Sequence, residues 1–563
     1  MKLRSLSKER SIGVEVSLQI LAYACVLVLI AAPLCMVFLG AFSKTMGQFE
    51  FSLEHFAALG RSANLEAIYN TIVVATFSTI FAVMLGFPVA FLSVRTNLPL
   101  SGVVEMISAF PLYLNPLAGA IGWILLASPN IGLLNRVVHS VLPGLTFDIY
   151  TPLGMGFAMG VFYSPYVFLF CSSALRAMDP ELEEASRITG ASEAHTVLHV
   201  TLPLITPALI SAILLVFVLS ASLFSIPLLI GWTVKYHVIS TMIYTLIAYP
   251  PPRYGEAATL SAVLLLVTAT FTLILRRKLD VKRYVTIGGR GYRPRKLDIG
   301  VWRYAVFAVC IAAQVLLLLL PMLMVLVTSF SENATSFVFT LNNYRLIFYG
   351  WWSEFFWRAT RNSLFISTVG ATLAMLLSTV VSYITVRTNL RGRGLLDHLS
   401  TSSIAVPGVV MAVGMIFFWL SVPVPMYGTI WILILAGIGK FLAYGVRSIS
   451  ASLVQISAEL EECAKICGAS LLRTIRDVTI PLVKSGFYSG WVLLFVVSFR
   501  EAAMVVLLYT YQTITLSVLM IDMFNSTMFT VFSSIGVLQM AVIWLIVIVF
   551  RKAFGVQVRM MEA

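Results

Sequence analysis

The sequence is short of charged residues. Only 11% of its 563 residues are Asp, Glu, Lys or Arg, whereas 59% are apolar and the mean hydropathy is +0.94. This composition excludes a water-soluble globular protein and a disordered chain. The apolar residues form runs of helical length, far longer than the roughly 10-residue strands of a membrane β-barrel. We therefore expect an all-α integral membrane protein.

Motifs for catalysis and metal binding are also missing. No G-x4-GK[ST] phosphate-binding loop occurs, because Gly439-Lys440 is followed by Phe441 inside an apolar run and lacks the upstream glycine. The six cysteines are scattered, and no set of metal-ligating residues stands out. The sequence predicts that this chain is not an enzyme and binds no metal or cofactor of its own.

Carboxylates within the apolar runs are scarce as well. Carriers driven by protons or sodium usually place carboxylates inside their spans, and the apolar runs here contain very few. The outward loops, expected at about residues 43–67, 128–151, 232–255, 331–361 and 511–527, are too short to form a solute-capturing domain. The chain therefore offers neither a set of ion-coupling carboxylates nor a large outward domain.

One segment occurs twice. It reads EEASRITGASEAHTVLHVTLP from Glu183 to Pro203 and EECAKICGASLLRTIRDVTIP from Glu461 to Pro481. Acidic residues at the start suit the positive end of a helix dipole, the glycine interrupts the helix, and the proline precedes the next apolar run. We expect a helix–glycine–helix unit in each copy, and the repetition indicates a pseudo-symmetric pair.

The spacing of both copies, EAA-x3-G-x9-I-x-LP, resembles the cytoplasmic coupling loop of ABC importer permeases. In that family the loop docks into a groove on an ATPase subunit, so the resemblance implies coupling loops at residues 181–203 and 459–481. The alternative is an amphipathic helix that merely joins two spans, which two copies of identical spacing argue against. The coupling residues implied are Glu183, Glu184, Ala185, Gly190, Leu202 and Pro203, and Glu461, Glu462, Ala464, Gly468, Ile480 and Pro481.

Most of the 38 Lys and Arg fall on one side of the expected spans. By the positive-inside rule this side is cytoplasmic, and it includes both repeated loops and both termini. A basic arm over residues 1–15 precedes an apolar run that is too long for a cleaved signal peptide, so we expect an uncleaved first span. The chain is predicted to lie in the bacterial cytoplasmic (inner) membrane.

The two halves of the chain also match outside the loops. VRTNL occurs at Val94–Leu98 and at Val386–Leu390, and Asn70 corresponds to Asn362. Six spans separate equivalent points, so the halves are parallel repeats, as in the type I ABC importer (MetI-like) fold that the resemblance implies. We divide the chain into a first permease repeat (1–280), a basic cytoplasmic linker (281–300) and a second permease repeat (301–563). Twelve spans are expected at about residues 16–42, 68–94, 103–127, 152–177, 205–231, 256–278, 301–330, 362–386, 398–421, 426–447, 484–510 and 528–552.

The resemblance extends over nearly the whole chain to the fused two-domain permeases of the ferric-iron type. This group also includes thiamine and aminoethylphosphonate permeases. It rests on FSIPLLIG (Phe224–Gly231), on residues 239–261, and on FREAAMVVLLY (Phe499–Tyr509) with TITLSVLM (Thr513–Met520). Ala502-Ala503 stands where Leu-Pro often follows the glutamate in the iron group.

This resemblance implies several partners and a cargo. The expected partners are two copies of a cytoplasmic ABC ATPase subunit, which bind ATP and Mg, a periplasmic or lipid-anchored substrate-binding protein, and membrane lipids, but no nucleic acid. Ferric iron is the expected cargo, moved inward by alternating access. Thiamine, aminoethylphosphonate, a polyamine or another small organic solute are alternatives. The rival classes are a 12-span secondary carrier, and a passive channel or structural membrane protein.

Four residues are candidates for the translocation pathway. Arg500 and Glu501 are charges within an expected span, where ionisable residues are functional by default. As neighbours on a helix they would point about 100° apart, with Glu501 near the outer gate. Both could instead be packing anchors between helices. The family-like segment in the first half adds Ser225 and Pro227.

Overall fold

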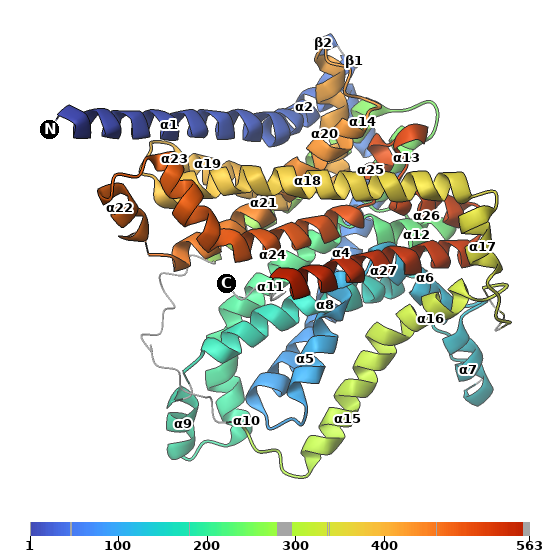
Figure 1. The fold of residues 1–563 in the computed structure, drawn as a ribbon. Coiled ribbons are helices and arrows are strands. Elements are labelled where there is room, and N and C mark those ends of the chain that lie inside the picture. Colours follow the sequence, from blue (N-terminus) through green and yellow to red (C-terminus); the bar gives the residue numbers. More distant parts are fainter. Residues whose placement is uncertain are drawn as a thin grey trace.

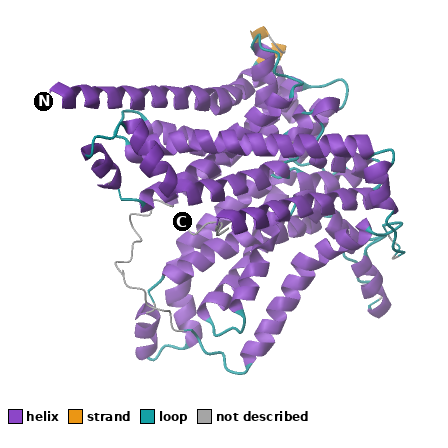
Figure 2. Cartoon of the chain, viewed as in Figure 1, coloured by secondary structure: helices purple, strands orange, loops and turns teal. Residues whose placement is uncertain are grey.

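The computed structural model describes residues 2–45, 48–142, 144–179, 181–278, 296–334, 336, 338–457 and 459–554. Helices make up nearly all of this part, and a two-stranded antiparallel hairpin projects at one edge (Figures 1 and 2). The expected linker at 281–300 lies mostly outside the described residues.

The first half runs from α1 to α14. Its elements are α1 (Lys2–Val26), α2 (Ala32–Ala41), β1 (Ser43–Thr45), β2 (Gln48–Phe51), α3 (Glu54–Ala57), α4 (Ser62–Arg95), α5 (Ser101–Ala109), α6 (Pro116–Ala127), α7 (Leu133–Val141), α8 (Pro152–Ala177), α9 (Glu181–Ile188), α10 (Glu193–Thr196), α11 (Leu202–Ser222), α12 (Ser225–Thr233), α13 (Ile239–Ala248) and α14 (Tyr254–Lys278).

Among the described residues, the second half repeats this order of helices without a counterpart of α7 or of the strands β1 and β2. Its elements are α15 (Trp302–Gln314), α16 (Leu320–Ser329), α17 (Asn342–Tyr349), α18 (Ser353–Arg387), α19 (Arg393–Ser402), α20 (Gly408–Ser421), α21 (Ile430–Gln455), α22 (Glu459–Ile466), α23 (Leu471–Thr474), α24 (Ile480–Phe499), α25 (Val505–Leu508), α26 (Leu516–Asn525) and α27 (Phe529–Phe554).

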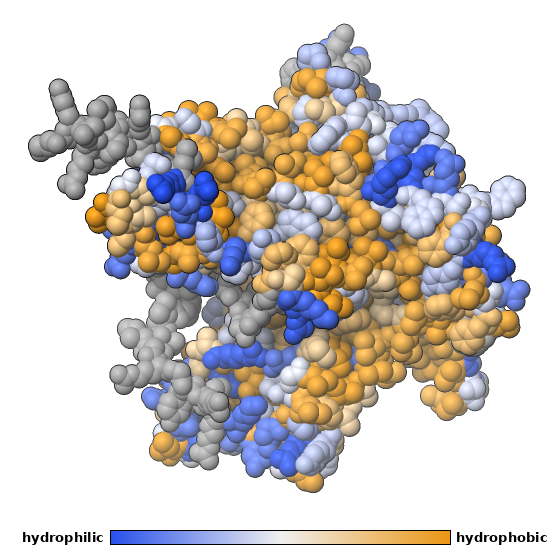
Figure 3. Space-filling model, in the orientation of Figure 1, coloured by the Kyte–Doolittle hydropathy of each residue, from blue (hydrophilic) through white to orange (hydrophobic). Residues whose placement is uncertain are grey.

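In the described part of the chain, ten helical segments are long and apolar enough to cross a membrane. The longest run side by side, and hydrophobic residues cover most of the visible face (Figures 1 and 3). The prediction of an all-α integral membrane protein is confirmed.

Two of the twelve expected spans are bent pairs of helices. The segment Ser101–Tyr113 meets α6 at 107°, and the segment Arg393–Ala405 meets α20 at 115°. We call the junction at Leu114 and Asn115 the first bend, and the junction at Val406 and Pro407 the second bend. Proline has no backbone N–H and disfavours a helical conformation in the residue before it, so Pro116 and Pro407 interrupt the two apolar runs.

Two expected spans extend too far outward. The runs 205–231 and 484–510 each contain a helix end, because α11 ends at Ser222 and α24 ends at Phe499. The expected outward loops that follow contain α13 and α26, whose apolar side chains are largely buried. Apolar run length alone cannot distinguish a long span from a span followed by short buried helices.

Each half packs a helix of its first span, α2 or α16, partly against the other half, and we call this the exchange of first helices. α2 packs against α14 of its own half and α20 of the other, and α16 packs against α27 and α6 in the equivalent way. Two glycines make this approach possible, because a Cβ on Gly122 would lie 2.5 Å from the Pro321 carbonyl oxygen and one on Gly414 2.5 Å from that of Pro33. The interface between the halves is therefore built from matched backbone contacts.

Candidate functional site

Both repeated loops adopt the predicted helix–glycine–helix form. α9 is followed by Gly190 and α10, and α22 is followed by Gly468 and α23. The two glycines have φ of 88° and 86°, in the left-handed region that favours glycine. A π-helical turn, Val197–Thr201 or Ile475–Thr479, then leads into the next long helix. Such turns insert one extra residue into a helix and are frequent at functional sites.

One glutamate of each loop points inward. Glu183 and Glu461 are both 5% exposed. Thr201 Oγ1, at the end of one π-helical turn, donates to Glu183 Oε1 at 2.6 Å, and Thr479 Oγ1 donates to Glu461 Oε1 at 3.0 Å. The turns thus hold the loops closed against the long helices.

The same glutamates pair with arginines from the repeated VRTNL motif. Arg95 Nη1 lies 3.7 Å from Glu183 Oε2, and Arg387 Nε lies 3.3 Å from Glu461 Oε1. These arginines end α4 and α18, so each loop is tied to the end of a long helix of its own half. Sequence reasoning missed this pairing, although the verbatim repetition of VRTNL signalled it.

The two ion pairs are not equivalent. Arg387 Nη2 also donates to the carbonyl oxygens of Leu453 and Ile456, at 3.0 and 2.8 Å, where α21 ends. The guanidinium nitrogens of Arg95 have no hydrogen-bond partner among the described residues, and that side chain is 1% exposed. Arg95 therefore depends on the charge of Glu183 alone, whereas Arg387 has two further acceptors.

The outer face of each loop offers an apolar residue at the same position. Ile188 is 86% exposed and Ile466 is 81% exposed. Of the other residues singled out by the sequence, Glu184, Leu202 and Ala464 are half-buried, and Ala185, Gly190, Pro203, Glu462, Gly468, Ile480 and Pro481 are exposed. Each loop therefore has an anchored inner side and a free outer side with an exposed isoleucine.

Arg500 and Glu501 do not lie on a helix. They follow the end of α24 at Phe499, so the expected 100° separation on one helix is wrong. Arg500 Nη1 donates to the carbonyl oxygens of Leu112 and Leu114, at 2.8 and 2.6 Å. The second half thereby binds the first bend.

Glu501 lies beside the second bend. Its Oε1 is 2.9 Å from Lys440 Nζ on α21 and accepts from the Met504 N–H at 3.0 Å. A Cβ on Gly408, the first residue of α20, would lie 2.5 Å from Lys440 Nζ and 2.9 Å from Glu501 Oε1. We call Lys440, Arg500 and Glu501 the central charge cluster, and it contacts both bends.

Ser225 and Pro227 are buried in α12, which packs against α6 and α8. None of the side-chain hydrogen bonds of the described residues joins Ser225 to the central charge cluster. Their assignment to the translocation pathway stays a prediction.

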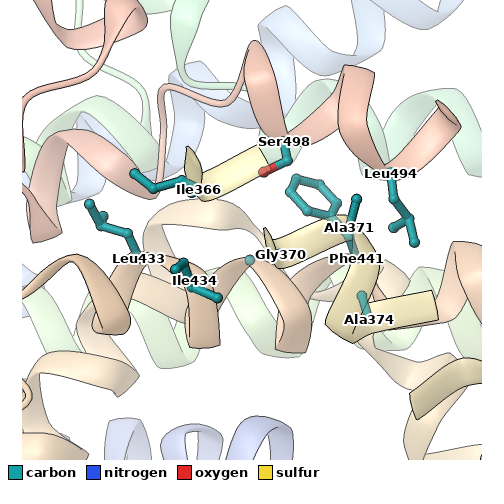
Figure 4. A pocket seen from close by; sticks show the side chains of 10 residues that line it. Ile366, Gly370, Ala371, Ala374, Leu433, Ile434, Phe441, Leu494 and Ser498 are labelled. Atoms are coloured by element: carbon teal, nitrogen blue, oxygen red, sulfur yellow. The ribbon is translucent and has the colours of Figure 1, made fainter. Parts of the chain in front are cut away.

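A small cavity nearby is lined almost entirely by apolar groups. It lies between α18, α21 and α24, and the Ser498 hydroxyl is the one side-chain oxygen among the residues that line it (Figure 4). Its lining residues are Ile366, Gly370, Ala371, Ala374, Leu433, Ile434, Gly437, Phe441, Leu494 and Ser498. With a single hydroxyl, this cavity offers little to a charged or strongly polar solute. Across the described residues, no group of three or more His, Cys, Asp and Glu could hold a metal ion.

The asparagine pair noted in the sequence anchors equivalent buried helices. Asn70 Nδ2 donates to the His237 carbonyl oxygen ahead of α13, and Asn362 Nδ2 donates to that of Ile514 ahead of α26, both at 2.9 Å. The next residue, Thr71 or Ser363, accepts from the first N–H of α13 or α26. The sequence showed the correspondence but not its role.

Comparison with known protein families identifies one that matches a segment in each half of the chain. The family described as "Binding-protein-dependent transport system inner membrane component" matches residues 78–282 and 370–559. These two matched segments contain the two repeated loops.

Three relatives illustrate the range of similar proteins. The ferric transport system permease protein FbpB of Actinobacillus pleuropneumoniae is 27% identical over 457 residues, which cover 81% of this chain and 66% of that protein. The putative ferric transport system permease protein FbpB 1 of Haemophilus influenzae is 26% identical over 462 residues, covering 81% of this chain and 72% of that protein. The putative 2-aminoethylphosphonate transport system permease protein PhnV of Salmonella paratyphi A is 27% identical over 202 residues, 35% of this chain and 75% of that protein. The chain thus spans just under two thirds of the length of the Actinobacillus relative.

Proposed function

The chain belongs to the family of binding-protein-dependent transport system inner membrane components, as a fused two-domain permease with the MetI-like fold, and we propose that it forms the membrane pathway of an ATP-driven importer. It is a transport component and not an enzyme. ATP and Mg would bind to the partner ATPase. The proposed division is a first repeat (1–280), a linker (281–300) and a second repeat (301–563).

The observation that carries the proposal is the matched construction of the two coupling loops. Each has a buried glutamate held by a threonine and an arginine, a left-handed glycine, and an exposed isoleucine on its outer face. Two equivalent docking units suit two copies of one ATPase subunit.

The ion pairs between the loops and the long helices suggest how movement of the ATPase would be transmitted to the membrane helices. When ATP closes the ATPase pair, the docked loops move toward each other. Because Glu183 and Glu461 tie the loops to α4 and α18, those helices move with them. Movement of the halves about their interface would open the pathway alternately to either side of the membrane.

The arrangement of the ends supports a cytoplasmic location for both termini. The N-terminal end of α1 and the C-terminal end of α27 lie at the same end of the bundle as α9 and α22 (Figure 1). A separate binding protein would deliver cargo at the opposite end, where α7 and α17 lie.

Ferric iron is the cargo we propose, because two relatives with that printed function match across 81% of this chain. The relative named for 2-aminoethylphosphonate matches 35% of it. Thiamine, 2-aminoethylphosphonate, a polyamine or another small organic solute remain the alternatives.

Purification of the tagged chain from its native membrane tests the proposal. We expect an ATPase subunit to co-purify, identified by mass spectrometry and by ATP hydrolysis. If the chain instead purifies alone and exchanges solute across liposomes without ATP, it is a secondary carrier and the importer proposal is wrong.

A further inference from the structure

The charges of the central charge cluster do not balance. Glu501 pairs with Lys440 at 2.9 Å, and no described ion pair includes Arg500. One positive charge thus remains without a carboxylate partner at the boundary between the two halves. A charge in the interior of a membrane protein is costly unless it is compensated, and such residues mark ligand pathways.

The Arg500 side chain is held in place by hydrogen bonds, but some of its N–H groups have no partner among the described residues. Both of its hydrogen bonds to described residues come from Nη1, which donates to the carbonyl oxygens of Leu112 and Leu114. The residue is half-buried, and neither Nε nor Nη2 is among the fully buried atoms that lack a partner. Two donors of a rigidly held guanidinium are therefore open to a ligand.

Two tyrosines add further donors around Arg500. Tyr166 and Tyr444 occupy equivalent places in the two halves, at the offset that relates Glu183 to Glu461. Tyr444 lies one turn after Lys440 on α21, and α8, which contains Tyr166, packs against the turn Phe110–Tyr113, where Arg500 binds the Leu112 carbonyl oxygen. Both tyrosines are half-buried, and neither hydroxyl hydrogen-bonds to another described residue. The open groups around Arg500 thus come from both halves and can all donate hydrogen bonds.

The helix arrangement adds to the positive potential. α6 starts two residues after Leu114, which binds Arg500, and α20 starts beside Lys440. The N-terminal end of a helix carries a partial positive charge, and half-helices in transporters point this end at anionic groups of their substrates.

We propose that Arg500, with Tyr166 and Tyr444, binds an oxyanion group of the cargo within the membrane. This rests on the proposed function and narrows the cargo. The planar guanidinium fork matches two oxygens of a phosphonate, phosphate or carboxylate. A bare ferric ion would be repelled by Arg500, so iron would pass as a complex whose ligand supplies the oxyanion. A free phosphonate is the other source of the same chemistry.

Binding to the purified full-length chain, together with any ATPase that co-purifies, tests this site. The probes are 2-aminoethylphosphonate, citrate and ferric citrate, titrated in lipid nanodiscs. We expect Arg500→Gln to weaken binding of the recognised probe about tenfold or more, since hydrogen bonds to charged groups are the strong ones. Arg500→Lys should retain part of the affinity. The probe that binds distinguishes a phosphonate cargo from an iron complex.

Two further variants serve as controls. Arg447→Gln removes a basic residue of α21 that is paired with Asp397 and is mostly exposed, and it should leave probe binding unchanged. The double variant Tyr166→Phe, Tyr444→Phe keeps the two carbonyl contacts of Arg500, and we expect it to weaken binding several-fold. It tests the site even if Arg500→Gln fails to fold.

The inference is wrong if no oxyanion probe binds the wild-type chain, or if Arg500→Gln and the double tyrosine variant both bind like wild type. Neither result touches the coupling loops, so co-purification of the ATPase would still support the importer. Conversely, if an oxyanion probe binds but no ATPase co-purifies, the binding-site proposal is supported and the importer proposal is wrong.

Discussion

At the scale of single residues, the two halves differ in how they hold the buried arginine next to the coupling loop. Arg387 keeps two backbone acceptors besides Glu461, whereas Arg95 has its ion pair with Glu183 and no hydrogen bond among described residues. A buried charge left without a partner is strongly destabilising, by about 3–5 kcal/mol in measured cases. The first loop should therefore be the more sensitive of the two.

We expect Glu183→Gln to loosen its loop more than Glu461→Gln does. The amide cannot neutralise Arg95, so α9 should detach and become open to protease, while Arg387 still holds the end of α21. Limited proteolysis and ATPase activity of the purified complex would measure this. Glu181→Gln, at an exposed position of the same loop, is the matched control. Equal effects of the two substitutions would show that the backbone contacts of Arg387 do not matter.

Residue-scale prediction from sequence succeeded where the reason was local. Gly190 and Gly468 were expected to interrupt a helix, and both have positive φ. The partners of Glu183 and Glu461 were not predicted, because their arginines lie far away in the chain and only the fold brings them together. The repeated VRTNL motif carried the information without indicating the contact.

At the scale of elements, each coupling loop depends on one left-handed turn. Apart from the adjoining residues, no heavy atom of the described part of the chain lies within 4 Å of a Cβ built on Gly190 or on Gly468, so a side chain there meets open space. Backbone conformation alone sets the cost, about 1–2 kcal/mol for an L-residue and more for a β-branched one. A substitution that forces the backbone out of this conformation would change the angle between the two short helices without disturbing the core.

Replacing both glycines with valine should uncouple the ATPase. We expect the chain to reach the membrane in normal amounts but to lose most ATPase association, measured by co-purification. The same positions changed to asparagine, which tolerates the left-handed region, should retain it. Normal association in the valine double variant would show that the turn does not shape the docking face.

The bends and short buried helices were the part of the fold that the sequence concealed. Both bends lie inside unbroken apolar runs, and hydropathy indicates that a segment is buried but not in which direction its helix runs. Pro116 and Pro407 were the available signals, yet proline also occurs inside α4, α8 and α11 without dividing them. The contacts of Arg500 with the carbonyl oxygens of Leu112 and Leu114, at the first bend, join residues far apart in the chain and could not be read from it.

At the scale of the whole molecule, duplication made the architecture predictable. Matching segments fixed the number and direction of the repeats, and the helical contacts follow the same pairs in each half. The exchange of α2 and α16 between halves was not predictable, because each is apolar enough to pack against any neighbour. Gly122 and Gly414 show where the exchange is tightest.

Gly122→Ala should destabilise the protein, and Gly370→Ala should not. The first places a methyl group against the Pro321 backbone of the other half, and that backbone cannot rotate away. Outside the adjoining backbone of α18, no described heavy atom lies within 4 Å of a Cβ built on Gly370, so alanine there gains helix propensity worth about 0.5–1 kcal/mol. Thermal unfolding of the solubilised protein would show opposite shifts. Shifts of the same sign would contradict tight packing between the halves.

The exchange of first helices also sets an order of events during synthesis. α2 enters the membrane early, but its neighbour α20 emerges only after the whole first half and part of the second have been made. α16, by contrast, finds α6 already in place. The first half therefore waits, incomplete, for its partner, and joining both halves in one polypeptide guarantees that the partner arrives next to it.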